Sequence, residues 1–153
     1  MKKIFFYLCF LAFFSCSGYE AIFSTKDLTF HISDIKNLDN KKTTKQIIQN
    51  ILSYKLDNIN NKNYSLKINS SENEEITSRD MKGNPLTYRV TINVKVEVFK
   101  SGSNILLDTI NIIKNFTYNY QVNQFDLNQY KRGIIKNLNV KVSQEIIIAL
   151  QLI

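Results

Sequence analysis

Cys16 stands where a covalent modification is expected, and its neighbours indicate which one. A basic start at residues 2–3 is followed by an unbroken apolar run over 4–14 and then by Ser15. That run is too short to span a membrane permanently, and the order basic, apolar, small is typical of a secretory signal. A cysteine at the cleavage point indicates the lipoprotein variant of this signal. There the thiol receives a diacylglyceryl group, and cleavage leaves Cys16 as the acylated first residue.

The cysteine count favours acylation over a disulfide. The sequence has two cysteines, and Cys9 falls inside the discarded signal, so Cys16 lacks a partner in an oxidising compartment. The signal is imperfect, because Phe13 and Phe14 stand where a bacterial lipobox prefers leucine and a small residue. The alternative is ordinary secretion, with cleavage near residues 15–18. We expect the lipoprotein, with an N-acyl diacylglycerol held covalently on Cys16 and no other cofactor.

The remaining reactive side chains do not form a catalytic or metal-binding pattern. His31 is the single histidine, whereas a metal site or a nucleophilic triad normally needs more partners. Glu72, Glu74 and Glu75 lack the spaced acidic residues and glycine of a calcium loop, so we interpret them as a solvated hairpin. No glycine-rich phosphate loop is present. We therefore predict no catalytic residue, no metal and no enzyme activity.

Composition and charge predict one exported domain. Removing residues 1–15 leaves enough chain for a single ordinary core, and one proline and four glycines argue against a long disordered linker. The formal net charge of +7 suits anionic partners such as lipid phosphates, although lysine is also the common solubilising residue of this sequence. We divide the chain into a signal peptide (1–15), an acylated tether (16–24) and one α+β domain (25–153). An exported protein is not expected to bind nucleic acid.

The first half of the domain shows a strand, a helix and a second strand. Residues 28–33 alternate apolar and polar, which predicts a half-buried strand. Thr43 and Gln46 have the spacing of a capping box, and the apolar face that follows predicts a helix ending within 57–63. Residues 64–68 alternate again, and the polar continuation to residue 82 is interpreted as a hairpin arm or loop.

The second half predicts two more strands and a long helix. Residues 82–85 form a turn signal, and the valine-rich alternation over 88–98 is the clearest strand in the chain. After a loop at 101–104, a fourth strand places Phe116, Tyr118 and Tyr120 on the core face, with Lys114 as the exception. Apolar residues at helical spacing over 126–150 predict the last helix, in spite of Gly133.

These elements predict a two-layer α+β fold in the order β-α-β-β-β-α. Four mostly antiparallel strands with one apolar face need a cover, and two amphipathic helices on that face supply it. The first strand, helix and second strand should form a parallel crossover, and the remaining pairs should be antiparallel.

The order of elements and several short motifs resemble the LptE family of outer-membrane lipoproteins, which act in lipopolysaccharide assembly. The start of the mature chain, residues 16–19 (Cys-Ser-Gly-Tyr), is similar to the family's Cys-Gly-aromatic start, with Ser17 inserted. The strand that begins Tyr88-Arg89-Val90, the loop at Gly102 and the aromatic strand at 116–120 look like the family's central hairpin. Residues 142–150 are similar to its closing helix.

The resemblance implies a role in the outer membrane. It implies a lipid-anchored protein on the periplasmic side that plugs the LptD β-barrel from within its lumen, helps the barrel to assemble and supports lipopolysaccharide insertion into the outer leaflet. Ser17 after the lipidated cysteine fits sorting to the outer membrane. By register with the family's basic positions, Arg79, Lys82 and Lys136 are candidates for binding lipopolysaccharide phosphates. The alternative is that these three are solvated surface charges.

Two other functions remain open from the sequence. One is a periplasm-facing pilot or ligand-binding lipoprotein unrelated to lipopolysaccharide transport, which would form no stable complex with the barrel. The other is an exported small-ligand binder or hydrolase, which needs a convergent polar pocket that the sequence does not indicate.

Overall fold

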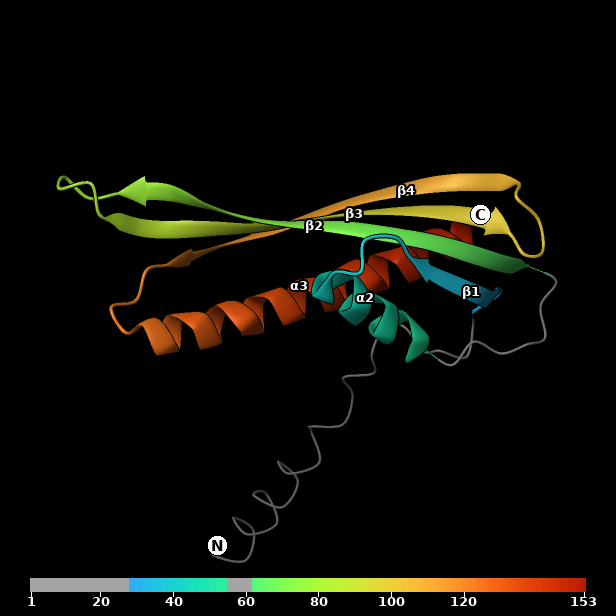
Figure 1. The fold of residues 1–153 in the computed structure, drawn as a ribbon, viewed down its shortest axis with the longest axis horizontal. Helices are drawn as coiled ribbons and strands as arrows, with labels where there is room; N and C mark the ends of the chain where they lie inside the picture. The colour runs from blue at the N-terminus through green and yellow to red at the C-terminus, as the bar shows by residue number, and fades with distance from the viewer. Residues whose placement is uncertain (1–27, 55–61) are drawn as a thin grey trace, which may run out of the picture.

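The computed structural model describes residues 28–54 and 62–153, which form four strands and two helices (Figure 1). The elements are β1 (His31–Asn37), α2 (Lys42–Leu52), β2 (Asn63–Arg79), β3 (Pro85–Lys100), β4 (Leu106–Asn119) and α3 (Gln124–Leu152). The predicted α+β order β-α-β-β-β-α is confirmed.

The four strands form one sheet in sequence order, β1-β2-β3-β4. β1 pairs with β2 in parallel, which confirms the predicted crossover, and the β2–β3 and β3–β4 pairs are antiparallel. The register places Leu66 opposite Val98 and Val94 opposite Ile112, so the apolar residues of neighbouring strands share one face. β1 and β4 are the two edges of the sheet.

Both helices lie on the same face of the sheet, and α3 runs beneath much of its length (Figure 1). The helices contact each other through Asn139, which donates to Gln46 Oε1 at 2.8 Å, and through Ser143, which donates to the Ile47 carbonyl at 3.3 Å. The most deeply buried side chains between the layers are Phe30, Ile47, Ile51, Leu66, Ile68, Val90, Ile92, Val96, Val98, Val142, Ile146 and Leu150. No described helix covers the opposite, polar face of the sheet.

The long β2–β3 hairpin is the predicted polar arm. The first half of β2 buries alternate residues, Tyr64, Leu66, Ile68 and Ser70, whereas residues 71–77 are exposed. The arm reaches past the start of α3 (Figure 1), so little of the helix layer remains to cover its end. Its turn, predicted at 82–85, is confirmed, and Gly83 adopts φ +84° there, which a β-carbon would strain.

The first strand and α2 differ in detail from the prediction. Leu28, Phe30 and Ile32 are buried as expected, but the paired strand begins at His31 rather than at residue 28. The predicted capping box is wrong: α2 begins after Lys41 without a side-chain cap, and Thr43 instead donates to Glu72 of β2 at 2.8 Å. The Thr43 hydroxyl therefore bonds to the sheet, whereas the local sequence pattern predicted that it would cap its own helix.

α2 also ends earlier than predicted. Its last residue is Leu52, and the expected end within 57–63 is therefore wrong. The Ser53 hydroxyl donates to the Asn50 carbonyl at 2.6 Å, so a side chain satisfies one of the carbonyls left open at the helix end. Residues 55–61 lie outside the described part of the chain.

The fourth strand places its aromatic residues partly at the surface. Tyr118 is buried as predicted, but Phe116 is 43% exposed and Tyr120 is 37% exposed, so the prediction that all three are core residues is wrong. β4 is an edge strand, and the inner faces of such strands are only partly covered by the layer below. Lys114, the exception in the apolar pattern, forms an ion pair with Glu145 of α3 at 2.5 Å.

α3 follows the predicted stripe closely. Asn123 caps its start by accepting a hydrogen bond from the Phe125 N–H at 3.0 Å. The side chains of the stripe that are buried are Leu127, Ile134, Leu138, Val142, Ile146 and Leu150. Within residues 28–54 and 62–153, no helix is both long and apolar enough to cross a membrane.

Candidate functional site

The predicted lipidation site lies outside the described residues. Cys16, the signal peptide at 1–15 and the tether at 16–24 all precede residue 28, where the description begins. The acylation of Cys16 therefore stays a prediction from the sequence.

The structure brings together two of the three predicted lipopolysaccharide-binding residues. Arg79 and Lys82 lie at the end of the β2–β3 hairpin, where Arg79 donates to the Gly83 carbonyl at 2.7 Å. Asp80 organises the turn by accepting the Lys82 and Asn84 N–H groups, each at 2.8 Å. These contacts hold the backbone of the turn in one conformation.

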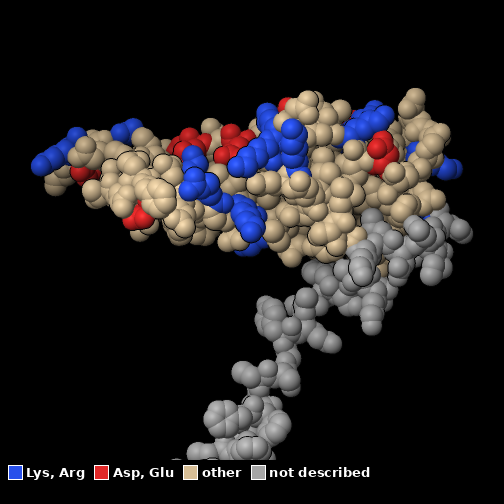
Figure 2. Space-filling model, turned by 60° about the horizontal axis from the view of Figure 1, so that its bottom comes forward, with Lys and Arg blue, Asp and Glu red and all other residues tan. Residues whose placement is uncertain are grey.

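Lys136 lies on a different element from the other two. It is exposed and sits twelve residues into α3, about 18 Å along the helix axis. The hairpin end lies beyond the start of that helix (Figure 1). Figure 2 likewise shows basic side chains at the hairpin end and a second group over the middle of the molecule. The three residues are exposed, but they do not form one compact cluster.

The other candidate residues occupy separate surroundings. Glu72 and Glu74 face the helix layer, where Glu72 accepts from Thr43, whereas Glu75 faces outward beside Arg89 at 3.5 Å. His31 Nδ1 is buried and has no hydrogen-bond partner. In the described part of the chain, no three His, Cys, Asp or Glu residues are arranged to hold a metal ion.

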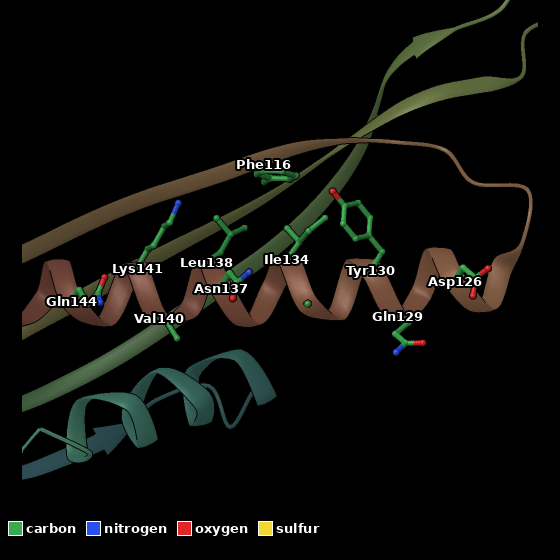
Figure 3. A pocket seen from close by; sticks show the side chains of 11 residues that line it. Phe116, Asp126, Gln129, Tyr130, Ile134, Asn137, Leu138, Val140, Lys141 and Gln144 are labelled. Carbon is green, nitrogen blue, oxygen red and sulfur yellow. The ribbon is translucent and has the colours of Figure 1, made fainter. Parts of the chain in front are cut away.

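A groove lies between α3 and the edge strand β4 (Figure 3). Its volume is about 810 Å³. Phe116 projects from β4, and Tyr130, Ile134 and Leu138 project toward it from α3. We call this the α3–β4 groove. The remaining lining residues are Asp126, Gln129, Gly133, Asn137, Val140, Lys141 and Gln144.

The α3–β4 groove has apolar side chains on α3 and β4, and polar side chains occur along its length from Asp126 through Asn137 to Gln144. Phe116 is 43% exposed and Tyr130 is 45% exposed, so both aromatic rings present accessible surface. Lys141 extends its ammonium toward β4 (Figure 3), and none of the ion pairs or hydrogen bonds found in the described residues involves this ammonium. A second hollow of about 550 Å³ shares Lys141 with this groove, and both partners of the Lys114–Glu145 ion pair line it.

A cluster of tyrosines lies beside one end of the groove. Tyr118 stacks on Tyr88, with ring centroids 5.7 Å apart, and meets Tyr130 edge-on at 6.1 Å. The Tyr118 hydroxyl donates to Glu74, whose other oxygen accepts from Lys131 Nζ at 2.5 Å. These contacts join β2, β4 and α3, so they fix the position of Tyr130 at the groove.

The charges of this cluster shift two pKa values in opposite directions. Burial, together with the hydrogen bond to Glu74, raises the pKa of Tyr118 well above its usual value. Burial also acts to raise the pKa of Glu74, but the hydrogen bonds from Lys131 and Tyr118 and the charge of Lys131 outweigh it and lower that pKa. At neutral pH the tyrosine is therefore neutral and the carboxylate is ionised, which is the arrangement that each hydrogen bond needs.

Sequence reasoning missed the α3–β4 groove. Its lining comes from two elements, and periodicity assigns each residue to a face without showing how closely the faces approach. One signal was present: Gly133 interrupts a helix at a position where alanine would be favoured, and it lines the groove.

The fold is shared with solved lipoproteins of low sequence identity. The crystal structure of the rare lipoprotein B from Shewanella oneidensis matches with a TM-score of 0.62 and 14% identity, covering 78% of this chain and 92% of that one. The solution structure of an uncharacterised lipoprotein B from Nitrosomonas europaea gives 0.61 and 12%, covering 84% and 88%. A minor lipoprotein from Acinetobacter baumannii gives 0.56 and 11%, covering 81% and 91%.

Comparison by sequence gives no assignment, because no protein-family model and no curated protein matches this chain. The structural similarity covers nearly the whole length of each neighbour, but at identities of 11–14% it establishes the fold alone. That fold is the α+β arrangement that the sequence predicted.

Proposed function

We propose that this chain is an outer-membrane lipoprotein, anchored through an acylated Cys16, that plugs an LptD-type β-barrel and supports lipopolysaccharide insertion into the outer leaflet. The observation that carries the proposal is the fold, which is shared over most of both chains with proteins described as lipoproteins. The signal that ends at Cys16 provides further support, which comes from the sequence rather than from the fold.

The physical properties of the domain suit a plug. A barrel lumen is wet, and one face of the sheet, which no described helix covers, exposes Arg89, Lys95 and other polar residues. An acyl anchor at Cys16 would hold the domain at the membrane and raise its local concentration near a barrel, so a modest interface would suffice for stable assembly.

Direct contact with lipopolysaccharide is proposed for Arg79, Lys82 and Lys136. The first two lie together on the hairpin end, and guanidinium and ammonium groups are suitable donors for phosphate. Reversing all three charges should lower retention of the protein on immobilised lipopolysaccharide, while the circular dichroism spectrum stays unchanged. If the triple variant is retained as well as the unmodified protein, these residues do not form the binding site.

The experiment that tests the function is purification of the tagged protein from outer membranes in mild detergent, followed by the intact mass of the bait. The proposal expects one large β-barrel protein in equal amount and a bait that starts at Cys16 and carries acyl chains. A bait recovered alone and without lipid would contradict both the anchor and the plug.

A second candidate function is a periplasm-facing pilot or ligand-binding lipoprotein. The α3–β4 groove favours it, because a plug that is enclosed by a barrel has no evident need for an open apolar groove. In the same purification this function predicts a lipidated bait without the barrel, so the two candidates give different results.

A further inference from the structure

We propose that the α3–β4 groove binds one long alkyl chain that ends in a carboxylate, with the carboxylate at Lys141 and the chain running toward Tyr130. This inference goes beyond the proposed function, since it concerns a ligand much smaller than lipopolysaccharide. It also does not depend on the barrel, so the two proposals can fail separately.

The size of the α3–β4 groove suits one alkyl chain. Its volume of about 810 Å³ is within the range of pockets that enclose small molecules. Its lining extends along α3 from Asp126 to Gln144, and eighteen residues of helix span about 27 Å. A hollow that is long and follows one helix fits an extended chain better than a compact ring system.

The floor of the groove is apolar where the alkyl chain of the ligand would lie. Phe116 faces Ile134 and Leu138 across the hollow, with Tyr130 beyond them (Figure 3). Both aromatic rings are more than 40% exposed in the described structure, so a bound chain would remove substantial apolar surface from water.

Gly133 keeps the middle of the groove open. Glycine is a poor helix former, yet this one lies well inside α3 and lines the hollow. A β-carbon built on Gly133 would have no heavy atom within 4 Å, so packing in the described structure does not require the glycine. The absence of a side chain leaves space that a ligand can use.

Lys141 supplies the charge at one end of the groove. Its ammonium has no ion-pair or hydrogen-bond partner in the described structure, and it points toward β4 (Figure 3). The nearest acidic residue of the adjoining hollow, Glu145, is already paired with Lys114 at 2.5 Å. Lys141 is the one cationic residue among the described residues that line the groove, and one ammonium matches a singly charged carboxylate. A doubly charged phosphate monoester would need more than one cation.

Asp126 sets the direction of the ligand. It lies at the opposite end of the lining, so its carboxylate would repel an anionic group placed there. The side-chain amides of Asn137 and Gln144 lie nearer to Lys141 along the helix and can donate to a carboxylate at that end. The distribution of charge therefore places the head at Lys141 and the tail toward Tyr130.

The test is titration of dodecanoate into the chain that begins at residue 16, with Cys16→Ala to prevent acylation, followed by calorimetry. The inference expects saturable binding at one site. Gly133→Phe should abolish binding because the ring fills the middle of the groove, whereas Gly133→Ala should bind like the unmodified chain. Lys141→Glu should weaken binding by about tenfold or more, since a charge-assisted hydrogen bond becomes a repulsion.

Lys45→Glu is the matched control for the charge change. Lys45 is exposed on α2, away from the groove lining, and its replacement should leave dodecanoate binding unchanged. Circular dichroism confirms that each variant is folded. If Gly133→Phe is unfolded, Lys141→Glu and the amide chemical shifts of residues 133–144 on titration still decide the question.

Four further ligands test the identity of the bound molecule. Displacement of bound dodecanoate by palmitate supports the inference. Equal binding of methyl dodecanoate, which carries no charge, overturns the assignment of the head to Lys141. Binding of a lysophospholipid or of lipopolysaccharide without any binding of dodecanoate overturns the choice of a free carboxylate, and absence of saturable binding overturns the site.

Discussion

Two carboxylates, Glu74 and Asp39, tie the sheet to the elements packed against it. Glu74 accepts from Tyr118 of β4 and from Lys131 of α3. Asp39 follows β1 and accepts the Ser70 N–H of β2 at 2.6 Å and the Thr44 hydroxyl of α2 at 2.9 Å. The pKa of each carboxyl is lowered, because its hydrogen bonds outweigh the opposing effect of burial.

Replacing Glu74 by glutamine should destabilise the protein and make its free energy of unfolding depend less on pH. We expect a loss of about 1 kcal/mol at neutral pH, the usual size of a partly exposed charged hydrogen bond. Because the folded pKa of Glu74 lies below its unfolded value, the contribution is full above the unfolded pKa and is lost as pH falls through the folded one. Urea unfolding at about pH 6 and about pH 3, on either side of the ordinary glutamate pKa, measures both effects.

Glu75→Gln is the matched control for Glu74→Gln. Glu75 is the next residue, lies on the outer face and makes an exposed ion pair with Arg89, so its replacement should change stability by less than about 0.5 kcal/mol. Equal effects of the two substitutions at both pH values would contradict the role given to Glu74.

Asp39→Asn should be more damaging than the same change at an exposed aspartate. It weakens three hydrogen bonds at once, including one from the Lys41 N–H at 2.9 Å, and we expect a cost of about 1–3 kcal/mol. Asp34→Asn on exposed β1 surface is the control and should be close to neutral. Thermal unfolding of the two variants compares them directly, and similar melting temperatures would show that Asp39 does not join the elements as described.

These two carboxylates were not predictable from the sequence. Glu74 stands among three glutamates in a polar stretch, and local pattern indicated only a solvated hairpin. Its partners, Tyr118 and Lys131, are 44 and 57 residues away, so the pairing depends on register and on helix placement. The same limit explains the mistaken capping box, in which Thr43 is used by the sheet rather than by its own helix.

The strands and the last helix were predictable because their side chains repeat with a clear period. Alternation over 88–98 places Val90 and every second residue after it on the buried face, and helical spacing gives the buried stripe of α3. The strand order and the α3–β4 groove were not predictable, since they depend on which edges and faces meet. Phe116 shows the difference: its face was predicted correctly, but its exposure follows from the position of β4 at the edge.

Two glycines should respond in opposite ways to the same substitution. Gly133→Ala in the interior of α3 should raise stability by about 1 kcal/mol, because alanine is the better helix former and the added carbon meets nothing. Gly83→Ala in the β2–β3 turn should lower stability by about 1 kcal/mol, because φ is +84° there. Chemical unfolding of both variants measures the changes, and a loss of stability in Gly133→Ala would show that α3 needs the glycine for packing.

In the described part of the chain, helices cover one face of the sheet and leave the other face open. Two helices pack on one side of the sheet (Figure 1). The other side presents mostly polar side chains along β2, β3 and β4. A plug inside a barrel meets the surrounding protein on both sides. A pilot or ligand-binding lipoprotein docks through one surface and leaves the others in solvent. The two functions therefore differ in which faces of the domain contact another protein.

The most direct measurement is photocrosslinking in intact cells from single positions on opposite sides of the domain. A photoreactive residue in place of Lys95 samples the open sheet face, and one in place of Lys45 samples the exposed side of α2; both positions are exposed. The plug predicts that the two positions crosslink to the same large β-barrel protein. Crosslinks from one face only, or from neither face to a barrel, would contradict it.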